Sequence, residues 1–357
     1  MKVYIKFIIL SFIKSIFFVS SIFFSLVILL NILTEIEFFK EMNVKTYLPL
    51  YTSLLNSPTM LFEMFPFIFL ISTQVFFINL FNDNQIQVFK YSGLKNSKIL
   101  MIASIASLTL GILIVVIFYG LSSSLKNIYL EIKTKYATDD KYLAVITNNG
   151  LWIKDNIDDI ISIVHASKIE EKFLINAFIT QFDQEKEVIR HIQSDKINIE
   201  KNKWTIINAK VFENNSVTKD DLRYINSNFN YEKIQSLFSN LSALSIIELY
   251  ELRKNYLSLN YSTTEIDLHI QKLISYPFFL LLMTILSSII MFNTKDFKSN
   301  TVKISIGLLL SVIIYYINNF FFVMGKSEKI SILISIWMPL FFLTISNFVI
   351  SFKINEK

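Results

Sequence analysis

The residues best suited to chemistry in this 357-residue chain are a short Gly-Lys-Ser run and three histidines. Val323–Ser327 reads VMGKS, which is how a phosphate-binding loop ends. Such a loop also needs a glycine at the position that Phe320 occupies. Phe320, Phe321 and Phe322 cannot form the cradle of backbone amides that holds the phosphates. The sequence therefore predicts that this chain does not hydrolyse ATP by itself.

The histidines do not form a recognisable metal or catalytic motif. His165, His191 and His269 are far apart and lack the HExxH spacing of a zinc site, so surface or strand histidines are favoured over ligands. A Ser-His-Asp triad can assemble from distant positions, but no GxSxG turn is present. The chain has no cysteine, which excludes disulfides and thiolate nucleophiles. We expect no catalytic residue, metal or cofactor.

The composition is typical of a polytopic membrane protein. Hydrophobic residues make up 53% of the chain, charged residues only 18%, and the mean hydropathy is +0.48. Soluble domains usually carry about 25% charged residues. Because no Lys/Arg-rich block is present, nucleic acid is an unexpected partner.

Six apolar runs are long enough to cross a bilayer, which needs about 20 residues. The first is too long for the apolar part of a signal peptide and is predicted to be a retained helix. A polar region separates the third run from the fourth. The runs are Ser15–Leu33, Thr59–Phe81, Ile99–Leu121, Ile274–Phe292, Ile304–Val323 and Ile330–Phe352.

Lysines in the short loops predict the orientation, because positive residues gather on the cytoplasmic side. The opposite loops hold only Lys40, Lys45, Lys326 and Lys329. Both termini are therefore expected in the cytoplasm and the polar region outside. The cytoplasmic lysines would be Lys2, Lys6, Lys14, Lys90, Lys95, Lys98, Lys295, Lys298, Lys303, Lys353 and Lys357.

The polar region alternates in the manner of β-strands. A hairpin is expected around Asn148-Asn149-Gly150, and a helical period begins at Ser245. The predicted fold is a membrane α + β protein: six transmembrane helices, three on each side of an inserted β-jellyroll-like domain. Further strands are predicted at Ile160–Ala166, Phe173–Phe182, Glu187–Gln193 and Trp204–Phe212. The predicted segments are 1–123 (three spans), 124–242 (β-domain), 243–269 (helical connector) and 270–357 (three spans).

Several polar residues lie inside the predicted spans, where charges are costly and tend to face protein, water or ligand. Two interpretations remain open: helix–helix hydrogen bonding, or a cavity for a large amphiphile. No Lys, Arg or Asp lies centrally, which argues against an ion-coupled transporter. These polar residues are Asn31, Glu63, Gln74, Asn79, Asn318 and Asn319.

Residues 82–100, NDNQIQVFKYSGLKNSKIL, form a polar island between the second and third apolar runs. Asn82, Asp83 and Asn84 offer capping side chains, and Gly93 can end a helix in the left-handed conformation. The stretch is predicted to be either an ordinary turn or a docking helix with an apolar stripe. Ile86, Phe89 and Val88 would make that stripe.

Four motifs, in this order and spacing, resemble the LptF/LptG permeases of bacterial lipopolysaccharide export, and LptG more than LptF. QIQVFKYSG at 85–93 resembles the coupling-helix segment of that family. NNGLWIKD at 148–155 resembles the strand that opens the LptG external domain. IQKLISYP at 270–277 and ISIWMPLFF at 334–342 resemble the lysine-proline and tryptophan-proline motifs of the fourth and last spans.

This resemblance implies the transmembrane subunit of an ABC-type exporter in the bacterial inner membrane. The implied partners are a second LptF-like permease, a cytoplasmic LptB-like ATPase dimer, a periplasmic LptC/LptA-like bridge, membrane lipid and lipopolysaccharide. The coupling helix would be 83–93, with Gln85 where the family usually has Glu. Its partner-binding residues would be Gln85, Ile86, Phe89, Lys90, Tyr91 and Gly93, and the substrate-cavity candidates are Asn31, Lys40, Glu63, Asn318 and Asn319.

Two other classes of protein remain as alternatives. A regulatory or mechanotransmission membrane protein would lack an amphiphile cavity. A polytopic membrane enzyme would need titratable residues that converge at one depth, and the sequence does not show them.

Overall fold

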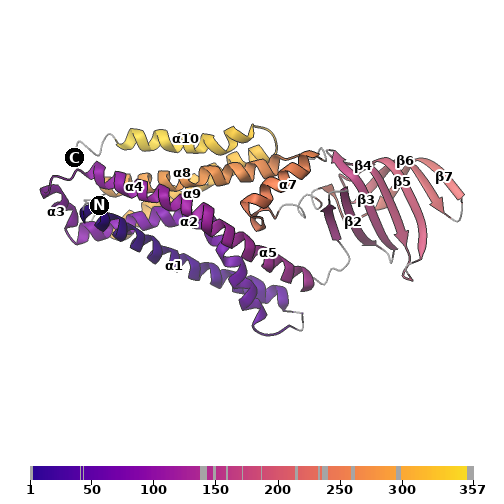
Figure 1. The fold of residues 1–357 in the computed structure, drawn as a ribbon, viewed down its shortest axis with the longest axis horizontal. Coiled ribbons are helices and arrows are strands. Elements are labelled where there is room, and N and C mark those ends of the chain that lie inside the picture. The colour runs from indigo at the N-terminus through magenta and orange to yellow at the C-terminus, as the bar shows by residue number, and fades with distance from the viewer. Residues whose placement is uncertain are drawn as a thin grey trace. The chain divides into compact units, whose positions relative to one another are not determined.

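The computed structural model describes residues 3–40, 42, 44–136, 143–147, 150–157, 160–170, 172–185, 187–213, 216–231, 234, 240–258, 262–294 and 299–351. The chain divides into two compact units. The helical unit comprises 1–132, 242–246 and 267–357, and the β unit comprises 133–241 and 247–266. Figure 1 shows the elements of both units.

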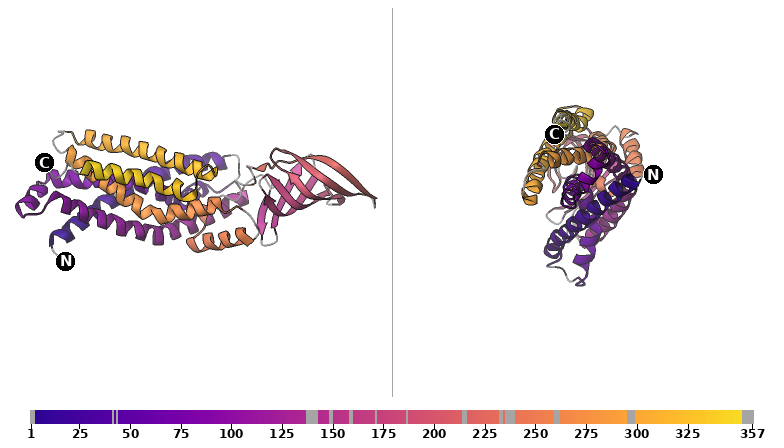
Figure 2. Two further views of the ribbon diagram at one scale, coloured as in Figure 1. Left: turned by 90° about the horizontal axis from the view of Figure 1, so that it is seen from above. Right: turned by 90° about the vertical axis from the view of Figure 1, so that its left-hand side faces the viewer.

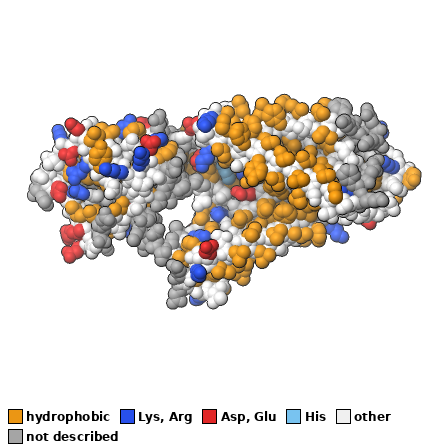
Figure 3. All heavy atoms as spheres, turned by 180° about the vertical axis from the view of Figure 1, so that it is seen from behind, with side chains coloured by type: hydrophobic (Ala, Val, Ile, Leu, Met, Phe, Trp, Pro, Cys, Tyr) orange, Lys and Arg blue, Asp and Glu red, His pale blue; other side chains and the backbone are white. Residues whose placement is uncertain are grey.

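Among the residues that the structure describes, the helical unit contains six helices that are long and apolar enough to cross a membrane, as predicted. They run along one another in both Figure 1 and Figure 2. Hydrophobic side chains cover most of the face of this unit seen in Figure 3. The helices are α1 (Val3–Phe39), α2 (Leu48–Asn82), α4 (Asn96–Leu113) continued by α5 (Tyr119–Tyr136), α8 (Thr264–Asn293), α9 (Asn300–Lys326) and α10 (Ile332–Ser351).

Besides α1, which starts at Val3 rather than near Ser15, two of these helices begin well before the predicted spans. α2 starts at Leu48 rather than near Thr59, and α8 starts at Thr264 rather than near Ile274. The early residues of α2 include the buried polar side chains Thr52 and Ser53, which a search for apolar runs passes over. Both helices lie at the centre of the bundle, because 72% of the residues in an 18-residue apolar stretch of each helix are buried.

The third span is interrupted by one turn of π-helix, Ile114–Phe118, between α4 and α5. Just before it, Gly111 lies against Pro277 of α8, so that an added Cβ would be 2.9 Å from the proline Cα. Ser107 and Thr284 share a hydrogen bond of 2.9 Å between the same two helices. A proline inside a membrane helix is tolerated where a neighbouring helix packs closely on it.

In the described part of the β unit, seven strands form an antiparallel sheet in sequential order. This confirms the inserted antiparallel β-domain, while the predicted turn at 148–149 lies outside the described residues. The last strand was not predicted. The strands are β1 (Leu143–Thr147), β2 (Gly150–Ile157), β3 (Ile160–Glu170), β4 (Phe173–Phe182), β5 (Val188–Asn198), β6 (Lys203–Glu213) and β7 (Ser216–Asn226), and α7 (Ile246–Ser258) follows in the helical stretch predicted from Ser245.

One face of the sheet forms the apolar core of the β unit. Alternate residues on the middle strands are fully buried, such as Ile153, Val164, Ile179, Ile192 and Val211, which lie in register across β2 to β6. Because side chains alternate between faces along a strand, the other face carries the polar residues.

The segment after β7 closes this core. Phe229 is fully buried, and its carbonyl oxygen accepts a 2.7 Å hydrogen bond from Trp204 Nε1. Ser227 Oγ and the Asn228 backbone N–H both donate to Asp155 Oδ2 on β2, at 2.7 and 2.9 Å. These hydrogen bonds connect the segment after the last strand to the second strand. Asp155 is buried there, and its carboxylate accepts several hydrogen bonds.

Candidate functional site

The polar island between α2 and α4 folds as a separate short helix, α3 (Gln85–Tyr91). Gly93 follows with φ +77°, which confirms the predicted left-handed end, and α4 begins at Asn96 as expected. The predicted side-chain cap is wrong, because Asn84 occupies the cap position at φ 56° and makes no capping hydrogen bond. Backbone hydrogen bonds form the turn, such as Asn84 N–H to the Phe81 oxygen at 3.1 Å, and Gln85 Nε2 also donates to Asp83 Oδ2 at 3.3 Å.

The apolar residues of α3 divide into an inward and an outward group. Ile86 is only 6% exposed, so it anchors the helix to its own chain. Phe89 is half-buried, and its ring makes an edge contact with Phe7 of α1, with 6.1 Å between centroids. Val88 and Tyr91 face outward and are 58% and 89% exposed. The expected stripe is therefore split between the bundle and the outside.

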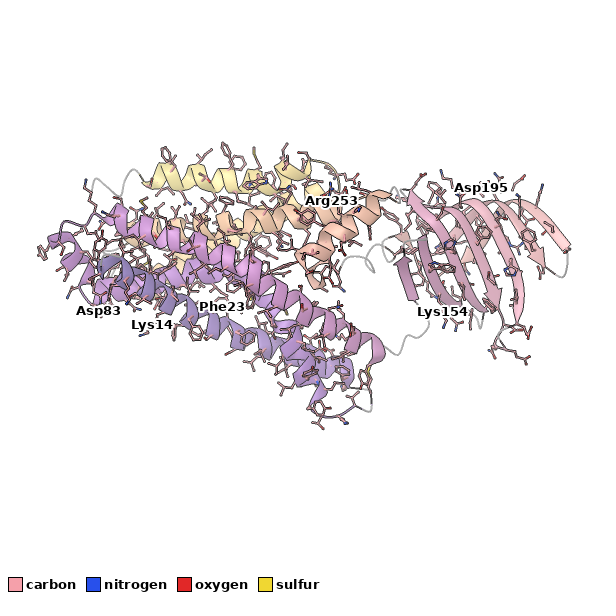
Figure 4. The ribbon with its side chains drawn as sticks, in the orientation of Figure 1. Lys14, Phe23, Asp83, Lys154, Asp195 and Arg253 are labelled. Atoms are coloured by element: carbon pink, nitrogen blue, oxygen red, sulfur yellow. The ribbon has the colours of Figure 1, made fainter. Side chains whose placement is uncertain are left out.

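α3 lies at one end of the helical unit, together with the beginning of α1 (Figure 1). Asp83 and Lys14 lie toward this end in Figure 4. Lys90, Lys95 and Lys98 are all exposed here. Of the other lysines predicted for this side, Lys6 is exposed and Lys303 is buried. The rest lie outside the described residues: Lys2, Lys295, Lys298, Lys353 and Lys357.

A cavity of about 290 Å³ lies within the helical unit, lined by α2, α8, α9 and α10. Three of the predicted cavity residues line it: Glu63, Asn318 and Asn319. Lys272 and Tyr276 of α8 line it as well. The remaining walls are mainly aromatic and aliphatic, from Phe62, Pro66, Phe67, Phe279, Met283, Tyr315, Phe322, Ile336 and Leu340.

Some polar side chains of this cavity have no partner in the described part of the chain, whereas its tyrosine Tyr276 and its serines donate hydrogen bonds to backbone oxygens. The side chains of Glu63, Asn318 and Asn319 form no hydrogen bond or ion pair with any described residue. Lys272 forms no ion pair there either, and its Nζ lies 5.7 Å from the centroid of the Phe322 ring. Polar groups within membrane spans that lack partners in the protein tend to face water or a ligand.

Asn31 and Lys40 are not among the residues that line the cavity. Asn31 is buried between α1 and α2, where its Nδ2 donates to Ser57 Oγ and its Oδ1 accepts from Asn56 Nδ2, both at 3.1 Å. The helix–helix interpretation therefore holds for Asn31. It also holds for Gln74, whose Nε2 donates to the Lys303 backbone oxygen of α9 at 2.9 Å. Lys40 follows α1 at an exposed position.

The sequence interpretation missed Lys272 and Tyr276 as cavity residues. Lys272 stood just before the predicted fourth span (Ile274–Phe292) and Tyr276 near its start, whereas α8 begins at Thr264 and carries both to the cavity. Tyr276 is buried, its hydroxyl donates to the Phe62 backbone oxygen, and its ring stacks on Phe62 with 4.5 Å between centroids. The helical spacing of Leu268, Lys272 and Tyr276 (i, i+4, i+8) was the signal available.

Each histidine has an ordinary structural neighbour. His165 packs on Trp152, with 4.4 Å between centroids, and His191 Nδ1 lies 3.0 Å from Thr180 Oγ1. His269 Nε2 lies 2.9 Å from the Tyr119 hydroxyl. Among the residues that the structure describes, no group of three or more His, Cys, Asp or Glu side chains could hold a metal ion.

Six apolar helices, three on each side of an inserted antiparallel β-sheet, define an integral, multi-pass membrane protein. The family model of the lipopolysaccharide export system permease LptF/LptG matches residues 6–352. The chain belongs to the LptF/LptG family of lipopolysaccharide export permeases, which is a transport family rather than an enzyme family. Comparison with individual curated proteins gave no match.

Proposed function

We propose that this chain is the transmembrane permease subunit of an ABC-type lipopolysaccharide exporter in a bacterial inner membrane. The N- and C-termini lie in the cytoplasm and the β unit in the periplasm. The exporter extracts lipopolysaccharide from the membrane and passes it toward the outer membrane. The observation that carries this proposal is the cavity lined by Glu63, Asn318 and Asn319 in a chain of this family.

The cavity receives only part of a lipopolysaccharide molecule. Its volume of about 290 Å³ is near the lower limit for a small-molecule site. Aromatic walls suit an acyl chain or sugar face, and the polar group of Glu63, Asn318 and Asn319 suits a headgroup. The exposed apolar faces of α1 and α9 are where a second, LptF-like permease completes the path.

α3 couples the permease to a cytoplasmic LptB-like ATPase dimer. The exposed Val88, Lys90 and Tyr91 make the contact with the ATPase, and Phe89 holds the helix against Phe7. Gln85 supplies a neutral hydrogen bond. ATP hydrolysis takes place in the separate ATPase subunit.

The β unit hands the lipid to a periplasmic LptC/LptA-like bridge. β7 supports this assignment because it lies at the end of the sheet and pairs only with β6 among the described strands. Val217, Leu222 and Tyr224 of β7 are all more than half exposed. An exposed edge strand offers its free backbone groups to an added strand from a partner.

Adjacent tyrosines of α9 allow a matched test of the cavity. Tyr315 lines the cavity, whereas Tyr316 does not and is 66% exposed. We expect a photo-reactive phenylalanine at position 315 to crosslink lipopolysaccharide in cells, and the same residue at 316 to crosslink it much less. Equal crosslinking at both positions would contradict the cavity assignment. No crosslinking at either position would favour a regulatory protein that moves no lipid.

A further inference from the structure

The cavity of the helical unit presents one cation and one anion that belong to different helices. Lys272 comes from α8 and Glu63 from α2, and both side chains are accessible. The two side chains do not form a salt bridge with each other or with any other residue in the described ranges. A cavity of this kind is complementary to a ligand that carries both charges.

Both charges lie at nearly the same level of the bundle. The Tyr276 hydroxyl donates to the backbone oxygen of Phe62, which directly precedes Glu63. Lys272 lies four residues before Tyr276 in α8, so it is displaced from that level by about 6 Å along the helix axis. One headgroup can therefore reach both side chains.

Two amides extend this polar wall. Asn318 and Asn319 of α9 line the same cavity, and their side chains have no hydrogen-bond partner among the described residues. Charges within a membrane span are costly unless they are compensated, and polar side chains there tend to face water or a ligand. A bound headgroup would supply the partners that the chain itself does not.

We propose that this cavity binds an amphiphile whose headgroup carries both a phosphate and a protonated amine. Lys272 binds the phosphate oxygens, Glu63 accepts a hydrogen bond from the ammonium group, and Asn318 and Asn319 bind the remaining oxygens. The inference rests on the proposed function, because it names the chemistry of the lipid that the same cavity takes. The amine distinguishes this ligand from a purely anionic one, which would place an uncompensated negative charge beside Glu63.

Two sources carry this chemistry: a glycerophospholipid with an ethanolamine headgroup, and a lipopolysaccharide with an amine-bearing substituent on its phosphates. Matched probe pairs separate them. The first pair is short-chain phosphatidylethanolamine and its N-acetyl derivative. The second pair is lipid A with and without a phosphoethanolamine substituent. Binding to the full chain in detergent is measured by native mass spectrometry.

We expect the wild-type chain to bind the free-amine member of at least one pair about tenfold more tightly than its partner, as for one charge-assisted hydrogen bond. A preference confined to the lipid A pair identifies the exported lipid as the source. A preference confined to the phospholipid pair identifies a membrane phospholipid as the resident ligand.

Isosteric variants assign the two roles. Glu63→Gln is expected to abolish the amine preference and keep phosphate-dependent binding. Lys272→Gln is expected to weaken the binding of both probes of a pair and to keep the preference for the free amine. Glu37→Gln and Lys329→Gln, at exposed positions outside the cavity, serve as controls and are expected to bind like the wild type.

Three outcomes would overturn the inference. Lipid A binding without any amine preference in the wild type refutes it and leaves the proposed function standing. Failure to bind either form of lipid A and either phospholipid refutes both. Equal losses for Glu63→Gln and Lys272→Gln, with the amine preference unchanged in both variants, show that the two residues pair with each other and not with a ligand.

Discussion

The residues of α3 divide into an inward and an outward group, whereas the sequence pattern predicted a single apolar stripe. Ile86 and Phe89 attach the helix to its own bundle, whereas Tyr91 extends outward. The apolar period predicted the helix correctly but could not show which apolar side chains turn inward. That division depends on the packing of α3 against α1, a contact between distant parts of the chain.

Tyr91→Asp is predicted to weaken co-purification of the ATPase by at least about tenfold, as expected when an exposed aromatic anchor is lost. The melting temperature of the detergent-solubilised chain should stay unchanged, because Tyr91 is 89% exposed. Phe89→Ala is the matched comparison and should lower the melting temperature through its lost contact with Phe7. Undiminished ATPase recovery with Tyr91→Asp would show that α3 is an ordinary turn.

Asn31 is predicted to stabilise the bundle rather than bind lipid. Asn31→Ala removes its two hydrogen bonds, to Asn56 and Ser57, and should destabilise the chain by about 1–2 kcal/mol. Thermal unfolding in detergent measures this loss. Crosslinking of lipopolysaccharide from position 315 should remain. If crosslinking disappears while thermal stability is unchanged, Asn31 belongs to the lipid path.

The sequence showed which polar residues lie in the spans but not which of them meet. Glu63, Asn318 and Asn319 come from helices far apart in the chain, and only packing brings them to one cavity. Lys272 was missed because α8 continues outward through polar residues that a hydropathy window excludes. Residue type alone also could not separate Asn31, which bonds between helices, from Asn318.

At the scale of elements, β7 is the strand that the sequence pattern did not predict. Its sequence, SVTKDDLRYIN, is exposed at nearly every position, because an edge strand lacks a neighbour on one side. A strand without a buried face has no regular alternation of polar and apolar residues. The inner strands have such a face and were therefore predictable, within a few residues at their ends.

The close contact between α4 and α8 gives a prediction at this scale. Gly111→Ala would place a methyl group 2.9 Å from the Pro277 Cα, where the backbone cannot give way easily. We expect a destabilisation of about 1–3 kcal/mol. Gly120→Ala is the control in the same span, since an added Cβ there has no atom within 4 Å. It should be neutral or stabilise by up to about 1 kcal/mol.

Thermal unfolding of both variants in detergent tests this pair. A normal melting temperature for Gly111→Ala would mean that the two helices do not pack as closely as described. Reduced export with normal stability would instead point to movement between α4 and α8 during transport, near the π-helical turn.

The whole chain combines a bundle of apolar helices, the short helix α3 and an antiparallel sheet with an exposed edge strand in one polypeptide. Its six apolar helices and its family identify a membrane protein of the lipopolysaccharide export permease family, and its helical unit contains a cavity. In the described part of the chain, Glu63 and Lys272 of the cavity form no ion pair with each other. The central claim is that this molecule moves lipopolysaccharide when a separate ATPase hydrolyses ATP.

ATP-driven extraction of lipopolysaccharide from proteoliposomes tests that claim most directly. The vesicles would contain the full chain, a second permease and the ATPase, with a soluble bridge protein as acceptor. We predict ATP-dependent transfer of lipopolysaccharide to the acceptor, which Tyr91→Asp abolishes and Lys329→Gln preserves. ATP hydrolysis by the assembled complex without any transfer of lipopolysaccharide would contradict the account.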